Sequence, residues 1–255
     1  MSLSYRKMIG SIAVVVMAST LLTRSTVAAD VAPDSKTAWH GDFAAGLSIT
    51  RGNSQTLTLN GSATATKLLP QDEYRLGING AYGLNNWDKS TETVNAENIA
   101  SFGDYKHLFG DRLFVDVRGD FLHDDVSSVQ NREIIGPALG YYFIKSDASR
   151  LSASAGGAYE HQRINHNDEN FMVVRFGERG ERNWGKKVKI WEEVQLLPKV
   201  DDFANYLLIS EAGLEVAMTQ HLALRVLGQD TYNSRPANGR FHNDLALITS
   251  IVWKY

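Results

Sequence analysis

Charged residues recur at every second position in several segments of this chain. Asp116, Arg118 and Asp120 alternate with Val115 and Val117. A period of two places the charges on one face of a β-strand and the apolar residues on the other. Continuing the alternation of other segments adds further candidates for the same charged surface: Arg175, Arg179, Glu181, Glu211, Glu215 and Arg225. Such a surface can line a path for ions or small polar solutes, or its acids and bases can neutralise each other in a filled interior. Because the charges form no ring of one sign, we expect the filled interior.

Residues suited to covalent catalysis or metal binding fall into no recognisable pattern. The 7 histidines lack HxH or HxxxH spacing, and cysteine is absent, which excludes thiolate ligands and cysteine nucleophiles. A GxxxxGK phosphate loop is also missing. The enzymatic alternative is an outer-membrane phospholipase, which needs a His base within reach of a Ser. Alternation directs Ser154 and His161 to opposite faces, so we expect no catalytic residues, no metal and no cofactor.

The overall composition argues against nucleic-acid binding. The chain carries 26 basic and 29 acidic residues, a formal charge of -3, and so lacks the basic excess that nucleic acids require. Its 21 glycines and many aromatic residues contrast with only 5 prolines. Scarce proline suits long strands, because proline has no N–H group for the ladder.

Residues 1–29 have the features of an export signal. Arg6 and Lys7 precede an apolar run at 8–22, and the small residues Val27 and Ala29 precede a cleavage site at Asp30. The run is short for a membrane-spanning helix. An uncleaved N-terminal anchor is the alternative, and in both cases we expect the rest of the chain to leave the cytoplasm.

The elements that must position the alternating charges are strands. After Asp30 no apolar run approaches the roughly 20 residues of a transmembrane helix. Segments of about ten residues alternate apolar with polar or small side chains instead. We count about twelve of them from Trp39 to Tyr255, and an even strand number would place both termini in the periplasm.

The connections between these segments alternate in length. Short turns are expected near residues 70–72, 109–112, 145–149, 184–186 and 218–220, and longer loops at 85–93, 124–131, 163–168, 199–204 and 233–240. Only residues 51–54 break the alternation. The sequence therefore predicts a short periplasmic segment at 30–38, followed at 39–255 by a transmembrane antiparallel β-barrel of up-and-down topology.

A soluble sandwich or lipocalin-like barrel would show the mirror image of this pattern, with the apolar face inside. The polar face here is rich in Thr, Ser, Asn, Gly and paired charges, as in a wet lumen, and Tyr or Trp recurs near strand ends. A sheet in lipid must also close, because every backbone group needs a partner. We therefore expect an outer-membrane location, with lipid and the barrel-insertion machinery as partners.

Two strands depart from the clean alternation. If Trp184 faces lipid, so do Glu178 and Arg182, and Glu192 lies across the following turn. One interpretation is an Arg182–Glu192 pair at a lateral contact, which would imply self-association. The other, which we favour, is a β-bulge at 192–193 that returns the acids to the lumen. Pro137 also predicts a local bulge, because it removes one donor from the ladder.

The closing residues carry an insertion signal. Trp253 and Tyr255 place two aromatics on one face of the last strand, which resembles the C-terminal signal read by the insertion machinery. The signal usually has Gly where Ser250 stands and a polar residue where Ile248 stands. An ordinary terminal strand with interfacial aromatics is the alternative.

The chain from about Trp39 to Tyr255 resembles the salt-induced outer membrane protein family. The residues that carry the resemblance are Gly46–Ser54, Gly140–Tyr142, Ser210–Val216, Tyr232–Pro236 and the closing strand. The resemblance implies an outer-membrane barrel loosely associated with salt or envelope stress, and supplies no catalytic residues. Two functions remain open: a structural or stress-related barrel with a filled interior, and a narrow passive channel.

Overall fold

A computed structural model describes residues 38–50, 56–85, 92–236 and 241–255, with the side chains of 48–50 left undescribed. The predicted export signal at 1–29, most of the segment 30–38 and the expected loop at 51–54 lie outside these ranges. Within them, no helix is long and apolar enough to cross a membrane.

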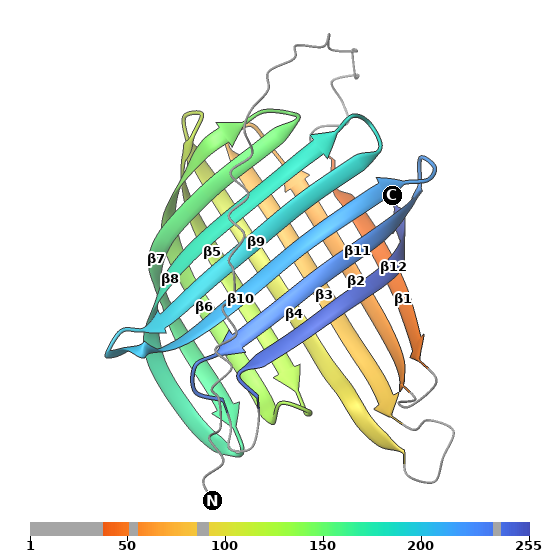
Figure 1. Cartoon of the computed structure of the whole chain (residues 1–255). Helices are drawn as coiled ribbons and strands as arrows, with labels where there is room; N and C mark the ends of the chain where they lie inside the picture. The colour runs from red at the N-terminus through yellow and green to blue at the C-terminus, as the bar shows by residue number, and fades with distance from the viewer. Residues whose placement is uncertain (1–37, 51–55, 86–91, 237–240) are drawn as a thin grey trace, which may run out of the picture. The chain divides into compact units, whose positions relative to one another are not determined.

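The described chain forms twelve strands, each antiparallel to the next, and β12 pairs with β1 to close the barrel (Figure 1). This confirms the predicted antiparallel up-and-down β-barrel. The strands are β1 (His40–Thr50), β2 (Thr56–Leu68), β3 (Asp72–Asn85), β4 (Thr93–Phe109), β5 (Leu113–Asp124), β6 (Val129–Lys145), β7 (Ser149–Ile164), β8 (Asn167–Trp184), β9 (Val188–Lys199), β10 (Asp202–Ala217), β11 (Leu222–Asn233) and β12 (Asn243–Lys254).

The seam between the first and last strands is short. Paired residues run from Asp42 opposite Lys254 to Ala45 opposite Ile251. Gly41 and Tyr255 extend the seam, since each backbone N–H donates to the carbonyl of the other residue at 3.4 and 3.1 Å. The ring of Tyr255 also stacks on Phe43 with 5.5 Å between centroids. The C-terminal aromatics therefore help to close the barrel.

Large apolar side chains cover the outside of the barrel. Leu139, Phe143 and Trp184 are 56%, 57% and 72% exposed. Along β6, exposed residues alternate strictly with buried residues from Arg132 to Phe143. Such a surface is stable in hydrocarbon, which also explains why the sheet has to close.

We call the end of the barrel where β1 begins and β12 ends the terminal end, and the opposite end the loop end. At the loop end, three connections predicted to be long are short. Asn165 and His166 alone join β7 to β8, with φ of 50° and 66°. Positive φ at both positions is typical of a type I′ hairpin turn, which lets both strands continue to the tip. The connections after β5 and β9 are also shorter than predicted and comprise residues 125–128 and 200–201.

Both predicted bulges are wrong. The β8–β9 register runs unbroken from Phe176 opposite Leu196 to Trp184 opposite Val188, so Glu192 and Glu193 point to opposite faces. The β5–β6 register is likewise continuous through Pro137, opposite Val117. On its other side Pro137 leaves pairings with β7 unmade, between Ile135–Tyr159 and Ala138–Gly156. The missing N–H donor of Pro137 thus interrupts the ladder to β7, but the register stays the same and no extra residue is inserted as in a bulge.

Candidate functional site: the barrel interior

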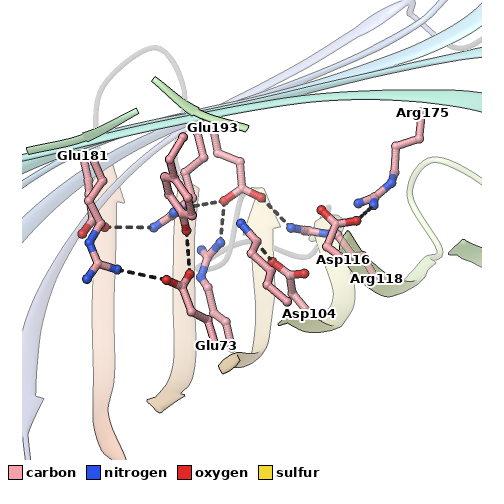
Figure 2. Close-up of polar contacts among 12 residues, drawn as sticks. Glu73, Asp104, Asp116, Arg118, Arg175, Glu181 and Glu193 are labelled. Atoms are coloured by element: carbon pink, nitrogen blue, oxygen red, sulfur yellow. Dashed lines mark hydrogen bonds and ion pairs between the residues drawn. The ribbon is translucent and has the colours of Figure 1, made fainter. Parts of the chain in front are cut away.

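Side chains from strands that are not neighbours meet inside the barrel. Glu193 on β9 accepts hydrogen bonds from Arg75 on β3 and Arg118 on β5, both at 2.6 Å. It also pairs with Arg179 on the adjacent β8. Because β3, β5 and β9 do not touch in the sheet, these contacts can form only across the lumen. Glu193 is therefore the centre of a cross-barrel ion-pair network (Figure 2).

An aromatic ring contacts two of these arginines. The guanidinium carbons of Arg75 and Arg118 lie over the ring of Phe102 on β4, 4.6 and 4.8 Å from its centroid. Both groups benefit from cation–π attraction to the ring while they reach Glu193. Asp120 accepts from Arg118 at 2.9 Å and offsets part of the excess positive charge.

The network continues toward the terminal end. Glu73 on β3 accepts from the hydroxyl of Tyr142 on β6 at 2.6 Å and lies 3.8 Å from Arg150 on β7. Glu181 joins Arg179 at 3.7 Å and Lys189 at 3.3 Å. These contacts tie β3 to β6, β7, β8 and β9, so the network braces the barrel across its width.

Two further groups of charges lie inside. Arg175 on β8 pairs with Asp116 on β5, and each side chain is only 4% exposed (Figure 2). On the other side of the barrel, Arg225 on β11 bridges Asp42 at 2.9 Å and Glu215 at 2.7 Å. Buried ions of opposite sign offset each other's loss of hydration.

The structure places every sequence-predicted lumen residue on the inner face and divides them into these groups. Arg118, Asp120, Arg179 and Glu181 belong to the cross-barrel network. Asp116 and Arg175 form a separate pair, as do Glu215 and Arg225. Glu211 accepts from the indole of Trp191 at 2.7 Å and from Gln229 at 3.0 Å.

Sequence reasoning missed the centre of the network. Arg75 stands between Tyr74 and Leu76, and the alternation of those two apolar residues would have placed it inside. Glu193 was expected in the lumen only through a bulge, whereas it reaches the lumen by plain alternation. Tyr142 lies on the face opposite Tyr141 and Phe143, and its hydroxyl donates to Glu73 inside the barrel.

Apolar side chains fill part of the lumen, which was expected to be polar. Leu108, Phe114 and Tyr142 pack together near the terminal end of β4–β6. A second cluster, near the loop end of β6–β10, contains Ile134, Ala158, Val173, Leu197 and Leu207. Together with the Asp116–Arg175 pair, these clusters fill the interior along β5–β9, which we call the filled side.

The other side of the lumen is open. A cavity of about 570 Å³ lies against β11, β12 and β1–β4, which we call the open side, and its lining also includes residues of β6–β10 such as Tyr142, Arg150 and Glu215. Its lining extends from Lys189 and Lys254 near the terminal end to Asn98 and Ala246 near the loop end. Many of the lining residues on the open side are small or polar, among them Ala44, Asn60, Ser62, Thr64, Gly77, Asn79 and Ser250. Large side chains thus pack much of one side of the lumen, and a cavity lies along the other.

A second cavity of about 430 Å³ opens at the loop end of the filled side. It is lined by Arg132 and Glu160, which pair at 3.2 Å, and by side-chain amides and aromatic rings. It shares no lining residue with the first cavity. Leu197 and Leu207, members of the apolar cluster, contribute to its lining.

The Ser and His residues weighed for hydrolytic chemistry lie on opposite faces of the sheet. Ser154 pairs with Gly177 on β8. Gly177 shares the inner face with Arg175 and Arg179, so Ser154 points into the lumen. His161 instead contacts Asn170 at 2.7 Å in an exposed position. In the ranges that the structure describes, no group of three or more His, Asp or Glu side chains could hold a metal.

Comparison with known proteins identifies relatives of the chain. The sequence model of a family described as "Protein of unknown function, DUF481" matches residues 43–255. The uncharacterised protein YdiY of Escherichia coli (strain K12) is 23% identical over 205 residues, which cover 79% of this chain and 77% of YdiY.

Solved structures with a similar fold are outer-membrane barrels. An outer membrane channel, COG4313, from Pseudomonas putida F1 has a TM-score of 0.48 at 8% identity, covering 89% of this chain and 100% of the channel. The NanC porin has a TM-score of 0.47 at 12% identity, with 85% and 98% covered.

Proposed function

The chain belongs to this family of unknown function, and from its interior we propose that it is a narrow, weakly selective outer-membrane channel for small polar solutes. The observation that carries the proposal is the cavity of about 570 Å³ along the open side. Ser62, Thr64 and Asn79 provide hydroxyl and amide groups there, which can replace part of a solute's hydration shell.

The charges beside this passage favour weak selection by sign. Its lining combines Arg75, Arg225 and Lys254 with Asp42 and Glu215. Most of these groups already pair with each other. A selective ion channel would instead carry a ring of one sign, so we expect cations and anions to pass at similar rates.

The filled side supports a different role. The cross-barrel network and the two apolar clusters brace the barrel as a structural envelope protein would require. A link to salt or envelope stress rests on the family resemblance alone. The outer-membrane location is supported by the apolar outer surface, and recovery of the mature chain as a soluble periplasmic protein would contradict it.

Single-channel conductance of the refolded protein in planar bilayers tests the proposal. We expect small, reproducible unitary steps, and a Ser62→Trp variant should reduce them, because Ser62 lies midway along β2 in the wall of the passage. Ala63→Trp is the matched control, since Ala63 pairs with the outward-facing Phe43 and its indole would enter lipid. Absence of unitary steps in the unmodified protein would reject the channel in favour of the structural role.

A further inference from the structure

Three charged side chains face away from the lumen on the strands beside the β8–β9 turn. Glu193 and Arg179 point inward, so their neighbours Glu192 and Glu178 point outward, and Arg182 lies on the same outer face. Within the described part of the chain, no ion pair or side-chain hydrogen bond includes Glu178, Arg182 or Glu192. They are therefore charges on the apolar surface without a partner in their own chain.

The position of these residues makes them costly in a monomer. Glu178 lies six residues from Trp184, or about 15 Å from the end of the strand along the membrane normal for a strand tilted by about 40°. Glu192 lies opposite Gly180, about 10 Å from that end by the same geometry. Both acids thus fall within the apolar band of about 25 Å that lipid covers. Arg182 lies about 5 Å closer to the end of the strand than Glu192.

Small residues lie beside these charges. One row of paired residues crosses the sheet through Leu151, Gly180, Glu192, Ala212 and Gly228. A Cβ added at Gly228 would meet only the Ala212 carbonyl oxygen, at 3.8 Å, whereas the Glu192 side chain lies over Gly180, 3.2 Å from such an atom. Small residues allow two membrane proteins to approach closely, whereas β6 presents Leu139, Tyr141 and Phe143.

We propose that this lateral patch, formed by Glu178, Gly180, Arg182, Glu192 and Ala212, binds a second copy of the same chain. A twofold axis along the membrane normal keeps both copies at the same depth, and such an interface joins a patch to itself. Arg182 of each copy then faces Glu192 of the other, about 5 Å away in depth and within reach of an arginine side chain. The patch carries both signs of charge, so it is complementary to itself, which is the reason to expect a second copy as its occupant.

Cysteine crosslinking tests the contact directly, because the natural chain has no cysteine. Gly180→Cys and Ala212→Cys introduce single thiols on either side of Glu192. Ala63→Cys is the matched control, on the outer face of β2 across the barrel. After oxidation of intact outer membranes containing the full chain, we expect a product of twice the monomer mass from at least one patch variant and none from the control. Monomer alone, or a product with another protein, would overturn the proposal.

Charge reversal separates pairing between copies from pairing within one copy. In a dimer of Arg182→Glu copies, two acids face each other at each contact. In a dimer of Glu192→Arg copies, two bases face each other there. When the two variants are produced together with different tags, the mixed pair is complementary at both contacts. We expect mixed crosslinks to exceed self-crosslinks by about tenfold. Equal amounts of mixed and self products, with all copies showing the heat-modifiable migration of folded barrels, would overturn the proposal.

Discussion

At the scale of single residues, the interior depends on Glu193. Three guanidinium groups reach this carboxylate, from Arg75, Arg118 and Arg179. Among the residues that the structure describes, Asp120 and Glu181 are the other acids that pair with these arginines. Replacing a whole buried ion pair by apolar groups changes the stability of a protein little. Removing one member is strongly destabilising, because it leaves an uncompensated charge. Replacing Glu193 should therefore reduce the free energy of unfolding more than replacing any one of the three arginines.

We predict that Glu193→Gln destabilises the barrel by about 2–3 kcal/mol, less than the ~3–5 kcal/mol for breaking a fully buried ion pair, because the Glu193 side chain is 13% exposed. The amide keeps the shape of the side chain but not its charge. Urea unfolding in detergent micelles measures the change. Glu97→Gln, at an exposed position on β4, is the control and should unfold like the unmodified protein; equal midpoints for both variants would contradict the central role of Glu193.

At the scale of elements, aromatic rings on one strand lie over glycines on the next. The Phe114 ring on β5 covers Gly140 on β6, and the Trp191 ring on β9 covers Gly213 on β10. Because glycine has no side chain, the ring packs directly against the backbone of the next strand, inside the lumen. Such pairs fix the register of neighbouring strands, because a shift by one residue would place a side chain under the ring.

We predict that Gly140→Val destabilises the β5–β6 pair by about 1–3 kcal/mol, the usual effect of overpacking. The new Cβ would lie 2.2 Å from the Phe114 ring, so the ring has to leave its position. Gly61→Val serves as the control, because a Cβ there meets nothing within 4 Å. Loss of near-ultraviolet circular dichroism and a lower unfolding midpoint should accompany only the first substitution.

The strands themselves were predictable from the sequence, because period-two alternation is a local signal. It placed Asp116 and Arg118 on one face and Val117 on the other without any knowledge of closure. The contacts across the lumen were not predictable in this way. Which residue of β3 meets Glu193 on β9 depends on strand tilt and stagger around the whole barrel. The expected bulge at 192–193 failed for another reason: it assumed that every charge points into the lumen, whereas Glu192 lies on the outer face.

At the scale of the whole barrel, the lumen is asymmetric. The filled side has large side chains such as Phe114 and Val173, and the open side has Ala44, Ser62 and Gly77. Twelve strands enclose more space than an eight-stranded barrel, whose side chains just fill it. Large side chains pack much of the filled side, while the small residues of the open side leave a cavity beside them.

This division predicts where a shortened side chain changes conductance. Arg75 belongs to the network but also lines the open cavity, so Arg75→Ala should widen the passage and raise the unitary conductance, while Arg118 and Arg179 still neutralise Glu193. Val173→Ala removes interior volume on the filled side, where Val173 is 1% exposed, and should leave the conductance unchanged. Planar-bilayer recordings of both variants compare the two sides within one barrel. An increase with Val173→Ala and none with Arg75→Ala would mean that solutes pass along β5–β9, and the assignment of the open side would be wrong.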